Sequence, residues 1–246
     1  MNTASSVVKS VINSVIKVEN LCRNYGSVRA VDNVNFEINR GEIVGLLGRN
    51  GAGKTTCLRM LTGLLLPSAG RIFINNIDIT ENPTEARSAI GFLPEQPALY
   101  PELTVFQYLQ FIARLRGVSR EDFKPVFESI LTKTGLENVD NFIIRNLSLG
   151  YKKRVGIAQT LIGATDLLVF DEPISGLDPH QIVEMRNLLR ELGKDHTIIL
   201  SSHILTEVSR TCDRVMILEK GKMIAELKGD QLNDLEDRFL QLTNAV

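Results

Sequence analysis

The chain has 246 residues, 43% of them hydrophobic, and a formal net charge of −1 at pH 7. This length suits one large α/β domain with a sizeable buried core. The near-neutral charge argues against general nucleic-acid binding, which needs a basic surface, so we expect no nucleic-acid partner. No apolar stretch approaches the roughly 18 residues that span a bilayer, so a membrane role would require a partner chain.

Residues 1–15 are predicted to be an N-terminal tail. They lack the continuous apolar core and the cleavage site of a signal peptide. Apolar residues between Val7 and Ile16 have helical spacing, but chain ends are commonly poorly ordered, and we expect a frayed tail. The three cysteines have no metal-ligand spacing and fit buried thiols in a reducing cytoplasm.

The most specific motif follows two predicted strands, at 16–21 and 34–38, that are joined by a turn at 24–27. An apolar run at 42–47, short enough for a buried strand, leads into Gly-Arg-Asn-Gly-Ala-Gly-Lys-Thr at 48–55. A helix is predicted to begin at Lys54 and to stop near Gly63. This is the phosphate-binding P-loop, G-x-x-x-x-G-K-[ST], in the strand-to-helix context that the motif needs.

The backbone of the P-loop is expected to bind an anion even without its side chains. Backbone N–H groups and the positive end of the helix dipole converge on one point, and glycines let the backbone wrap around it. Lys54 supplies a charge for the β- and γ-phosphates, and the Thr55 hydroxyl is placed for Mg²⁺. The predicted nucleotide-binding residues here are Gly48, Asn50, Gly51, Ala52, Gly53, Lys54, Thr55 and Thr56.

The middle of the chain changes from strands to helices. A strand is predicted at 71–74, then a short helix capped by Asn82 with Pro83 at its first position, then a strand at 91–93. Two helices follow, at 104–116 and 120–134, and no sheet strand is predicted between 95 and 150. We therefore expect a helical subdomain, about 96–160, inserted in an α/β domain that covers 16–246.

The remainder alternates strands and helices. Strands are predicted at 167–170 and 197–200 with a helix at 180–192 between them. A hairpin around Lys220-Gly221 and a closing helix at 230–242 complete the chain. The predicted fold class is α/β, with a mainly parallel core sheet, an antiparallel β part and a helical subdomain.

Two carboxylates end the strand at 167–170, where side chains of parallel strands face a ligand crevice. Asp171 is the natural partner of Mg²⁺, through water, and Glu172 could orient and deprotonate an attacking water. Charged residues also solvate strand ends, but the P-loop upstream favours the site.

A second helix N-terminus lies shortly before that strand. Ser148 is a candidate N-cap, and Gly150 would allow a phosphate to approach the backbone closely. By itself this segment could equally be an ordinary capped helix.

These motifs, in this order, resemble the ATP-binding cassette of ABC transporters over about Ile16 to Leu227. The resemblance implies that 48–55 is Walker A, 147–151 the signature and 167–172 Walker B. It implies ATP as the nucleotide, with Tyr25 stacking on adenine, and Mg²⁺ near Thr55, Asp171 and Glu95. It also implies a D-loop role for Asp178 and a switch-histidine role for His203, so that the implied catalytic residues are Glu172, His203, Lys54 and Glu95.

The sequence departs from the family pattern at two places. The signature reads Leu-Ser-Leu-Gly-Tyr where the family has Leu-Ser-Gly-Gly-Gln. Leu149 replaces the first glycine and Tyr151 stands at the glutamine position, while Ser148 and Gly150, the pair that faces a partner's phosphate, are kept. Glu95 stands where the family has a glutamine, with Gln96 as the alternative, and it adds a negative charge near the γ-phosphate. We favour Glu95 at that position. Both features resemble exporter cassettes of gliding-motility and nitrous-oxide-reductase maturation systems.

The resemblance implies a motor subunit. Two cassettes, most simply identical, would close head to tail over two ATP molecules and drive a separate integral membrane permease. The chain would then be cytoplasmic and peripheral on the inner face of the cell membrane. The alternative is a soluble ABC ATPase of an assembly or maturation system without a permease. A translation-type or DNA-repair ABC protein fits less well, because neither a second cassette nor a long coiled-coil insertion is present.

Overall fold

The structure is a computed structural model in which residues 14–244 are described. The helical spacing noted between Val7 and Ile16 lies mostly outside these residues. Ser14 and Val15, which we assigned to the tail, are instead the first residues of a strand, and Val15 is buried.

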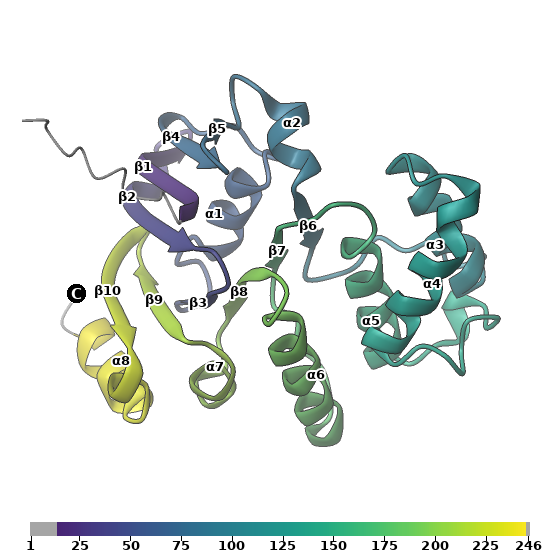
Figure 1. Ribbon diagram of the computed structural model, residues 1–246. Helices are drawn as coiled ribbons and strands as arrows, with labels where there is room; N and C mark the ends of the chain where they lie inside the picture. Colours follow the sequence, from purple (N-terminus) through teal and green to yellow (C-terminus); the bar gives the residue numbers. More distant parts are fainter. Residues whose placement is uncertain (1–13, 245–246) are drawn as a thin grey trace, which may run out of the picture.

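Two sheets form the larger part of the molecule (Figure 1). The smaller sheet is antiparallel, in the order β2-β1-β4-β5. Its strands are β1 (Ser14–Tyr25), β2 (Val28–Asn39), β4 (Ala69–Ile74) and β5 (Ile77–Asp78). This sheet is the antiparallel part that the sequence predicts, and its two longest strands extend beyond the predicted ranges.

The larger sheet has the order β10-β9-β3-β8-β7-β6 and is parallel except for the β9–β10 hairpin. Its strands are β3 (Ile43–Leu47), β6 (Ile90–Leu93), β7 (Leu167–Phe170), β8 (Thr197–Ser202), β9 (Arg214–Glu219) and β10 (Lys222–Lys228). Every residue of β3, β7 and β8 is buried. Burial on both faces explains why these strands are continuous apolar runs in the sequence.

Helices cover both faces of the larger sheet. Residues of α1 (Lys54–Leu61) share one core with the antiparallel sheet and with β3. On the opposite face, α6 (Pro179–Leu192), α7 (Leu205–Thr211) and α8 (Leu235–Asn244) lie side by side (Figure 1). A short helix, α2 (Pro83–Ser88), connects β5 to β6.

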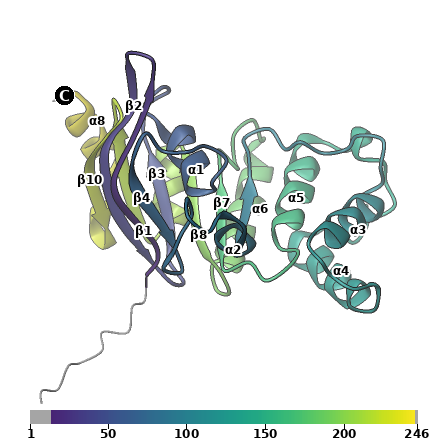
Figure 2. The ribbon, with the colours of Figure 1, turned by 90° about the horizontal axis from the view of Figure 1, so that it is seen from above.

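Three helices form a separate lobe beside the sheets (Figure 2). They are α3 (Val105–Leu115), α4 (Arg120–Thr134) and α5 (Leu149–Thr160), and they enclose a hydrophobic core of their own. A 3-10 turn, η1 (Ile144–Asn146), precedes α5. None of the helices within residues 14–244 combines the length and the apolar composition that a bilayer crossing requires.

Three local predictions differ from the structure. Asn82 is at the N-cap of α2, but its side chain makes no capping hydrogen bond. The closing helix predicted at 230–242 is instead a 3-10 turn, η2 (Gly229–Leu232), followed by α8. The break allows Leu232 and Leu235 both to be buried in the core beside β9 and β10, so packing overrides helix propensity. The sequence prediction also lacks α7.

Candidate functional site

A cavity of about 550 Å³ opens where β3 turns into α1. P-loop residues 49–55 line it, together with residues that follow β6, β7 and β8 in the parallel sheet, whereas Gly48 is not among the lining residues. The lining residues that the sequence analysis singled out are Asn50, Gly51, Ala52, Gly53, Lys54, Thr55, Thr56, Glu95, Glu172 and His203. The carboxyl ends of the parallel strands therefore gather these side chains at one edge of the sheet.

The P-loop is held in its shape by close backbone contacts. Gly53 has φ +106°, and a Cβ atom there would lie 2.4 Å from the carbonyl oxygen of Ala30. A Cβ atom at Gly48 would lie 2.3 Å from the carbonyl oxygen of Leu218. Only glycine fits at these positions, so the turn can wrap closely before α1 begins at the cavity.

Lys54 is nearly buried below the P-loop. Its ammonium donates to the carbonyl oxygens of Gly48 at 2.8 Å and Arg49 at 3.4 Å. The same nitrogen lies 3.7 Å from Oε1 of Glu172. The side chain is therefore directed at the centre of the loop, where the chemistry of a lysine suits a phosphate.

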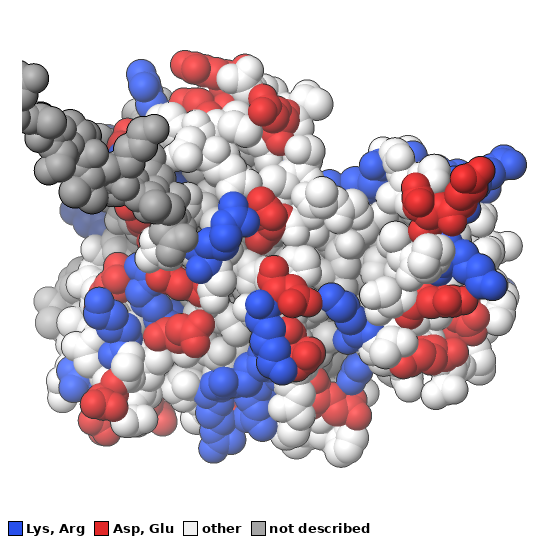
Figure 3. Space-filling view, viewed as in Figure 1, with Lys and Arg blue, Asp and Glu red and all other residues white. Residues whose placement is uncertain are grey.

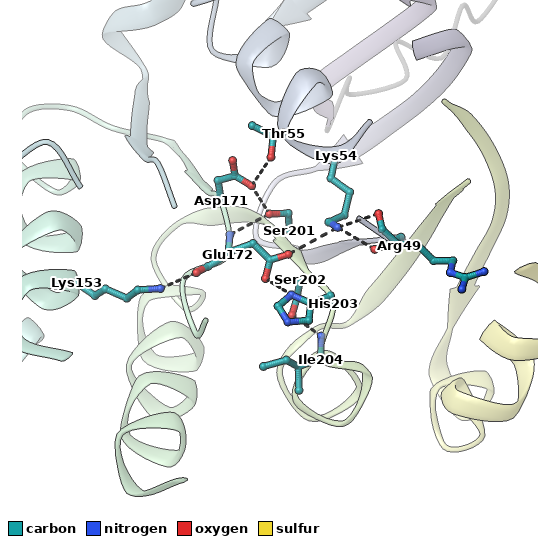
Figure 4. Close-up of polar contacts among 11 residues, drawn as sticks. Arg49, Lys54, Thr55, Lys153, Asp171, Glu172, Ser201, Ser202, His203 and Ile204 are labelled. Atoms are coloured by element: carbon teal, nitrogen blue, oxygen red, sulfur yellow. Dashed lines mark hydrogen bonds and ion pairs between the residues drawn. The ribbon is translucent and has the colours of Figure 1, made fainter. Parts of the chain in front are cut away.

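Asp171 and Thr55 meet beside the cavity (Figure 4). Thr55 Oγ1 donates to Asp171 Oδ1 at 3.3 Å. Ser201 Oγ donates to the same carboxylate oxygen at 2.6 Å and accepts from the backbone N–H of Glu172 at 2.9 Å. Ser201, which lies in β8, thus holds both acidic residues in place.

Glu172 has an unusual backbone conformation, and its carboxylate contacts His203. Its φ is +49°, a left-handed conformation that few non-glycine residues adopt. Oε2 lies 2.8 Å from Nδ1 of His203. Because an ionised carboxylate can only accept, Nδ1 carries the proton in this contact. The pair points from two neighbouring strand ends toward the P-loop (Figure 4).

Glu95 and Gln96 differ in position. Both side chains are exposed, but Glu95 lines the cavity and Gln96 is not among the lining residues. The arrangement agrees with our preference for Glu95 as the residue that faces the site.

Other candidate residues lie outside the cavity. Tyr25 is 46% exposed at the end of β1, with the Arg23 guanidinium 4.8 Å above its ring. Ser148, Gly150 and Tyr151 surround the N-terminus of α5 and line a different cavity, with residues of α6. Asp178 is the exposed N-cap of α6 and accepts from the N–H of Gln181 at 2.9 Å. One protomer therefore does not bring the signature residues to its own P-loop.

Sequence reasoning missed two residues of the site, Ser201 and Lys153. Ser201 ends an apolar strand, and its polar side chain at the carboxyl end of a parallel strand was a usable signal. Lys153 is buried, and its ammonium donates to the carbonyl oxygen of Glu172 at 2.8 Å. No local pattern distinguishes it from Lys152, the partly exposed lysine before it.

A comparison with known families supplies the observation that identifies the chain. The profile of the ABC transporter family matches residues 31–175, which include the P-loop, the signature segment and the carboxylates after β7.

The chain belongs to the ABC transporter family of ATP-binding cassettes.

Curated relatives of this cassette are named for transport. The bacitracin transport ATP-binding protein BcrA of Bacillus licheniformis is 38% identical over 232 residues, which cover 94% of this chain and 75% of that protein. The lantibiotic transport ATP-binding protein SrtF of Streptococcus pyogenes is 36% identical over 226 residues, which cover 92% of this chain and 96% of that protein.

Solved structures share the whole fold. The structure of cbiO1 from Clostridium perfringens, part of the ABC transporter complex cbiONQ, has a TM-score of 0.83 with 32% identity and covers 93% of each chain. A dimeric ATP-binding cassette in a post-hydrolysis state bound to ADP and Pi has a TM-score of 0.77 with 27% identity, covering 87% of this chain and 98% of that one. The cassette described here is accordingly an ATP-binding protein of the ATP-hydrolysing class.

Proposed function

We propose that the chain is the ATP-hydrolysing subunit of an ABC transporter. In this proposal two copies pair head to tail and act on a separate membrane permease, most simply one that exports its cargo. The subunit would be held on the cytoplasmic face of the membrane through the permease. The observation that carries the proposal is the division of the site, since P-loop and carboxylates share one cavity while the signature residues lie at another.

The P-loop cavity suits a triphosphate. Backbone N–H groups from the turn and from the α1 N-terminus supply donors, and Lys54 adds a positive charge below them. Asn50 and Thr56 belong to the same lining. Tyr25, exposed at the end of β1, offers a ring to the adenine outside the cavity.

The residues present fit Mg²⁺. Thr55 and Asp171 bring a hydroxyl and a carboxylate oxygen within 3.3 Å of each other, and these hard oxygen donors match that ion. No group of three or more His, Cys, Asp or Glu side chains within residues 14–244 could form a complete protein cage for a metal. Such a pair leaves the other coordination positions to phosphate oxygens and water. When bound, the ion would neutralise charge on the β- and γ-phosphates, and Glu95, which lines the same cavity, would add a carboxylate to its surroundings.

Glu172 and His203 form the hydrolytic pair of the proposal. The Glu172 carboxylate accepts a proton from water as it attacks the γ-phosphorus, while the P–O bond to ADP breaks. His203 holds that carboxylate through Nδ1, and Nε2 would donate to the γ-phosphate when the ring carries both protons. Lys54 stabilises the charge that the departing phosphate carries.

The second cassette completes the enclosure. Ser148 and Gly150 of one copy would meet the γ-phosphate bound to the other copy, with Tyr151 beside them, and Asp178 would connect the two sites. Closure excludes water from the reaction and adds donors to the transition state. The dimeric neighbour bound to ADP and Pi supports this arrangement.

Names of relatives support a transporter over a soluble assembly ATPase. Both BcrA and SrtF are named as transport ATP-binding proteins, for bacitracin and for lantibiotics. Co-purification with a membrane protein from detergent-solubilised membranes separates the two functions, because the assembly ATPase would be recovered without one.

The decisive experiment is Glu172→Gln. The amide keeps the size of the side chain but cannot take a proton, so kcat should fall by about 10²–10⁴-fold while ATP still binds. ATP-bound dimer should accumulate, because hydrolysis no longer opens it. Steady-state phosphate release and size-exclusion chromatography with ATP measure the two effects.

Glu236→Gln makes the same change on an exposed residue of α8 and serves as the control. We expect wild-type turnover from it. A wild-type rate for Glu172→Gln would overturn the assignment of Glu172 as the base.

A further inference from the structure

Lys153 is a buried cation that the reaction described above does not use. It lies in α5, five residues after Ser148, and is only 3% exposed. Lysine is rarely buried to this degree unless its charge has a partner. The neighbouring Lys152 is less buried, and its ammonium donates to the carbonyl oxygen of Arg145 at the surface.

The Lys153 ammonium reaches the backbone of Glu172. It donates to the Glu172 carbonyl oxygen at 2.8 Å. This hydrogen bond connects the helical lobe to the end of β7. Figure 4 shows Lys153 and Lys54 approaching Glu172 from opposite sides, the first at the backbone and the second at the carboxylate.

The Glu172 backbone needs support. A left-handed conformation at a glutamate is strained and persists only where the surroundings hold it. Ser201 Oγ holds the N–H side of the residue, and Lys153 holds the carbonyl side. These two bonds orient the residue whose carboxylate meets His203.

Two carboxylates partly offset the cost of burying the Lys153 ammonium. Burial lowers the pKa of Lys153 below its ordinary value, and the charges of Glu172 and Glu95 act in the opposite direction without reversing the shift. Glu95 is the residue that adds a negative charge to this cavity, and Lys153 supplies a positive charge close to it.

We propose that Lys153 is a positioning residue for ATP hydrolysis, whose ammonium fixes the Glu172 backbone and so directs the Glu172 carboxylate to the reacting water. The proposal rests on the role of Glu172 in the proposed function. It also ties that carboxylate to α5, the helix that carries the signature residues.

Lys153→Met tests the proposal, because methionine has a similar length but no donor and no charge. We expect kcat to fall at least about tenfold, since small displacements of reacting groups cost this much or more, with KM for ATP within about twofold of wild type. Lys153→Arg retains a charged donor and should recover part of the lost kcat. Lys152→Met is the matched control and should leave kcat unchanged.

Thermal unfolding separates positioning from a purely structural role. Replacing a buried charge by an apolar residue of similar size is often neutral or stabilising, so Lys153→Met should unfold at or above the wild-type temperature while its kcat falls. A loss of kcat accompanied by a proportionate loss of stability would contradict positioning. If Lys153→Met does not fold, Lys153→Gln replaces it, because its shorter side chain ends before the Glu172 oxygen.

A double variant identifies the residue through which Lys153 acts. In a Glu172→Gln background, Lys153→Met should cause no further loss of single-turnover rate, because the carboxylate it positions is gone. An equal fold loss in both backgrounds, or wild-type kcat for Lys153→Met alone, would overturn the inference. A wild-type rate for Glu172→Gln would instead overturn the proposed function, so the two failures are distinguishable.

Discussion

Ser201 shows how one buried hydroxyl organises two acidic residues. It lies at the carboxyl end of β8, where it donates to Asp171 and accepts from the N–H of Glu172. A strand-end serine is in reach of both because β7 and β8 are parallel neighbours in the sheet. The position of the carboxylates therefore depends on a residue 30 positions away from Asp171 in the sequence.

We predict that Ser201→Ala lowers both stability and turnover. The change leaves a buried N–H unpaired, which costs about 1–3 kcal/mol, and each kcal/mol lowers Tm by about 2–4 °C in a protein of this size. Calorimetry and phosphate release measure the two effects. Ser209→Ala removes an exposed hydroxyl that donates to the Thr206 carbonyl oxygen on α7, and equal effects from both variants would contradict the role given to Ser201.

Among the elements, α3 has the most complete local signal. Thr104 Oγ1 accepts from the N–H of Gln107 at 3.1 Å, and Gln107 Oε1 accepts from the N–H of Thr104 at 3.0 Å. This reciprocal capping box satisfies two N–H groups that a helix terminus otherwise leaves without partners. The helix begins where the sequence places it for this reason.

We predict that Thr104→Ala lowers stability by about 0.5–2 kcal/mol, the usual cost of losing a side-chain N-cap. Thr104→Ser keeps the hydroxyl and should unfold close to the wild-type temperature. ATP affinity should stay unchanged in both, because α3 is remote from the P-loop cavity. Equal melting temperatures for the alanine and serine variants would show that the cap contributes nothing.

Elements without such a signal were harder to predict. The helix α7 has no side-chain cap, and its only pattern is the spacing of Ile204, Val208 and Cys212. The separation of η2 from α8 follows from contacts of η2 with β9 and β10, which no local pattern contains. Strongly periodic or fully apolar segments, in contrast, were predicted almost to the residue, as with α4 and β7.

At the scale of the whole molecule, the two candidate sites of one chain lie apart from each other. The P-loop cavity and the cavity beside Ser148 share no lining residue. Lysine and arginine alternate with aspartate and glutamate over the face shown in Figure 3, in keeping with the net charge of −1. In the proposed dimer of identical cassettes the two copies carry the same net charge, so pairing would depend on fit at the two sites and on ATP.

We predict that specific ATPase activity rises with protein concentration, because a monomer lacks the donors that Ser148 and Gly150 supply to a partner. Phosphate release over a dilution series, with light scattering on the same samples, measures activity against the dimer fraction. Adding the Glu172→Gln variant to a dilute wild-type sample should raise wild-type turnover less than adding more wild type. Full activity from a strictly monomeric sample would contradict the divided site.

The sequence alone determined the parts of this protein that depend on neighbouring residues. The P-loop, its strand and its helix follow from glycine spacing and an apolar run, and Asp171 and Glu172 follow from their place after a buried strand. The tertiary structure decided what comes together from distant segments. It placed Glu95 rather than Gln96 at the cavity, set Ser201 and Lys153 on either side of the Glu172 backbone, and kept Ser148 away from its own P-loop. The physical reason is that these contacts join separate strands and helices. Packing of the whole core fixes the relative positions of those elements, and no periodic pattern in the sequence predicts them.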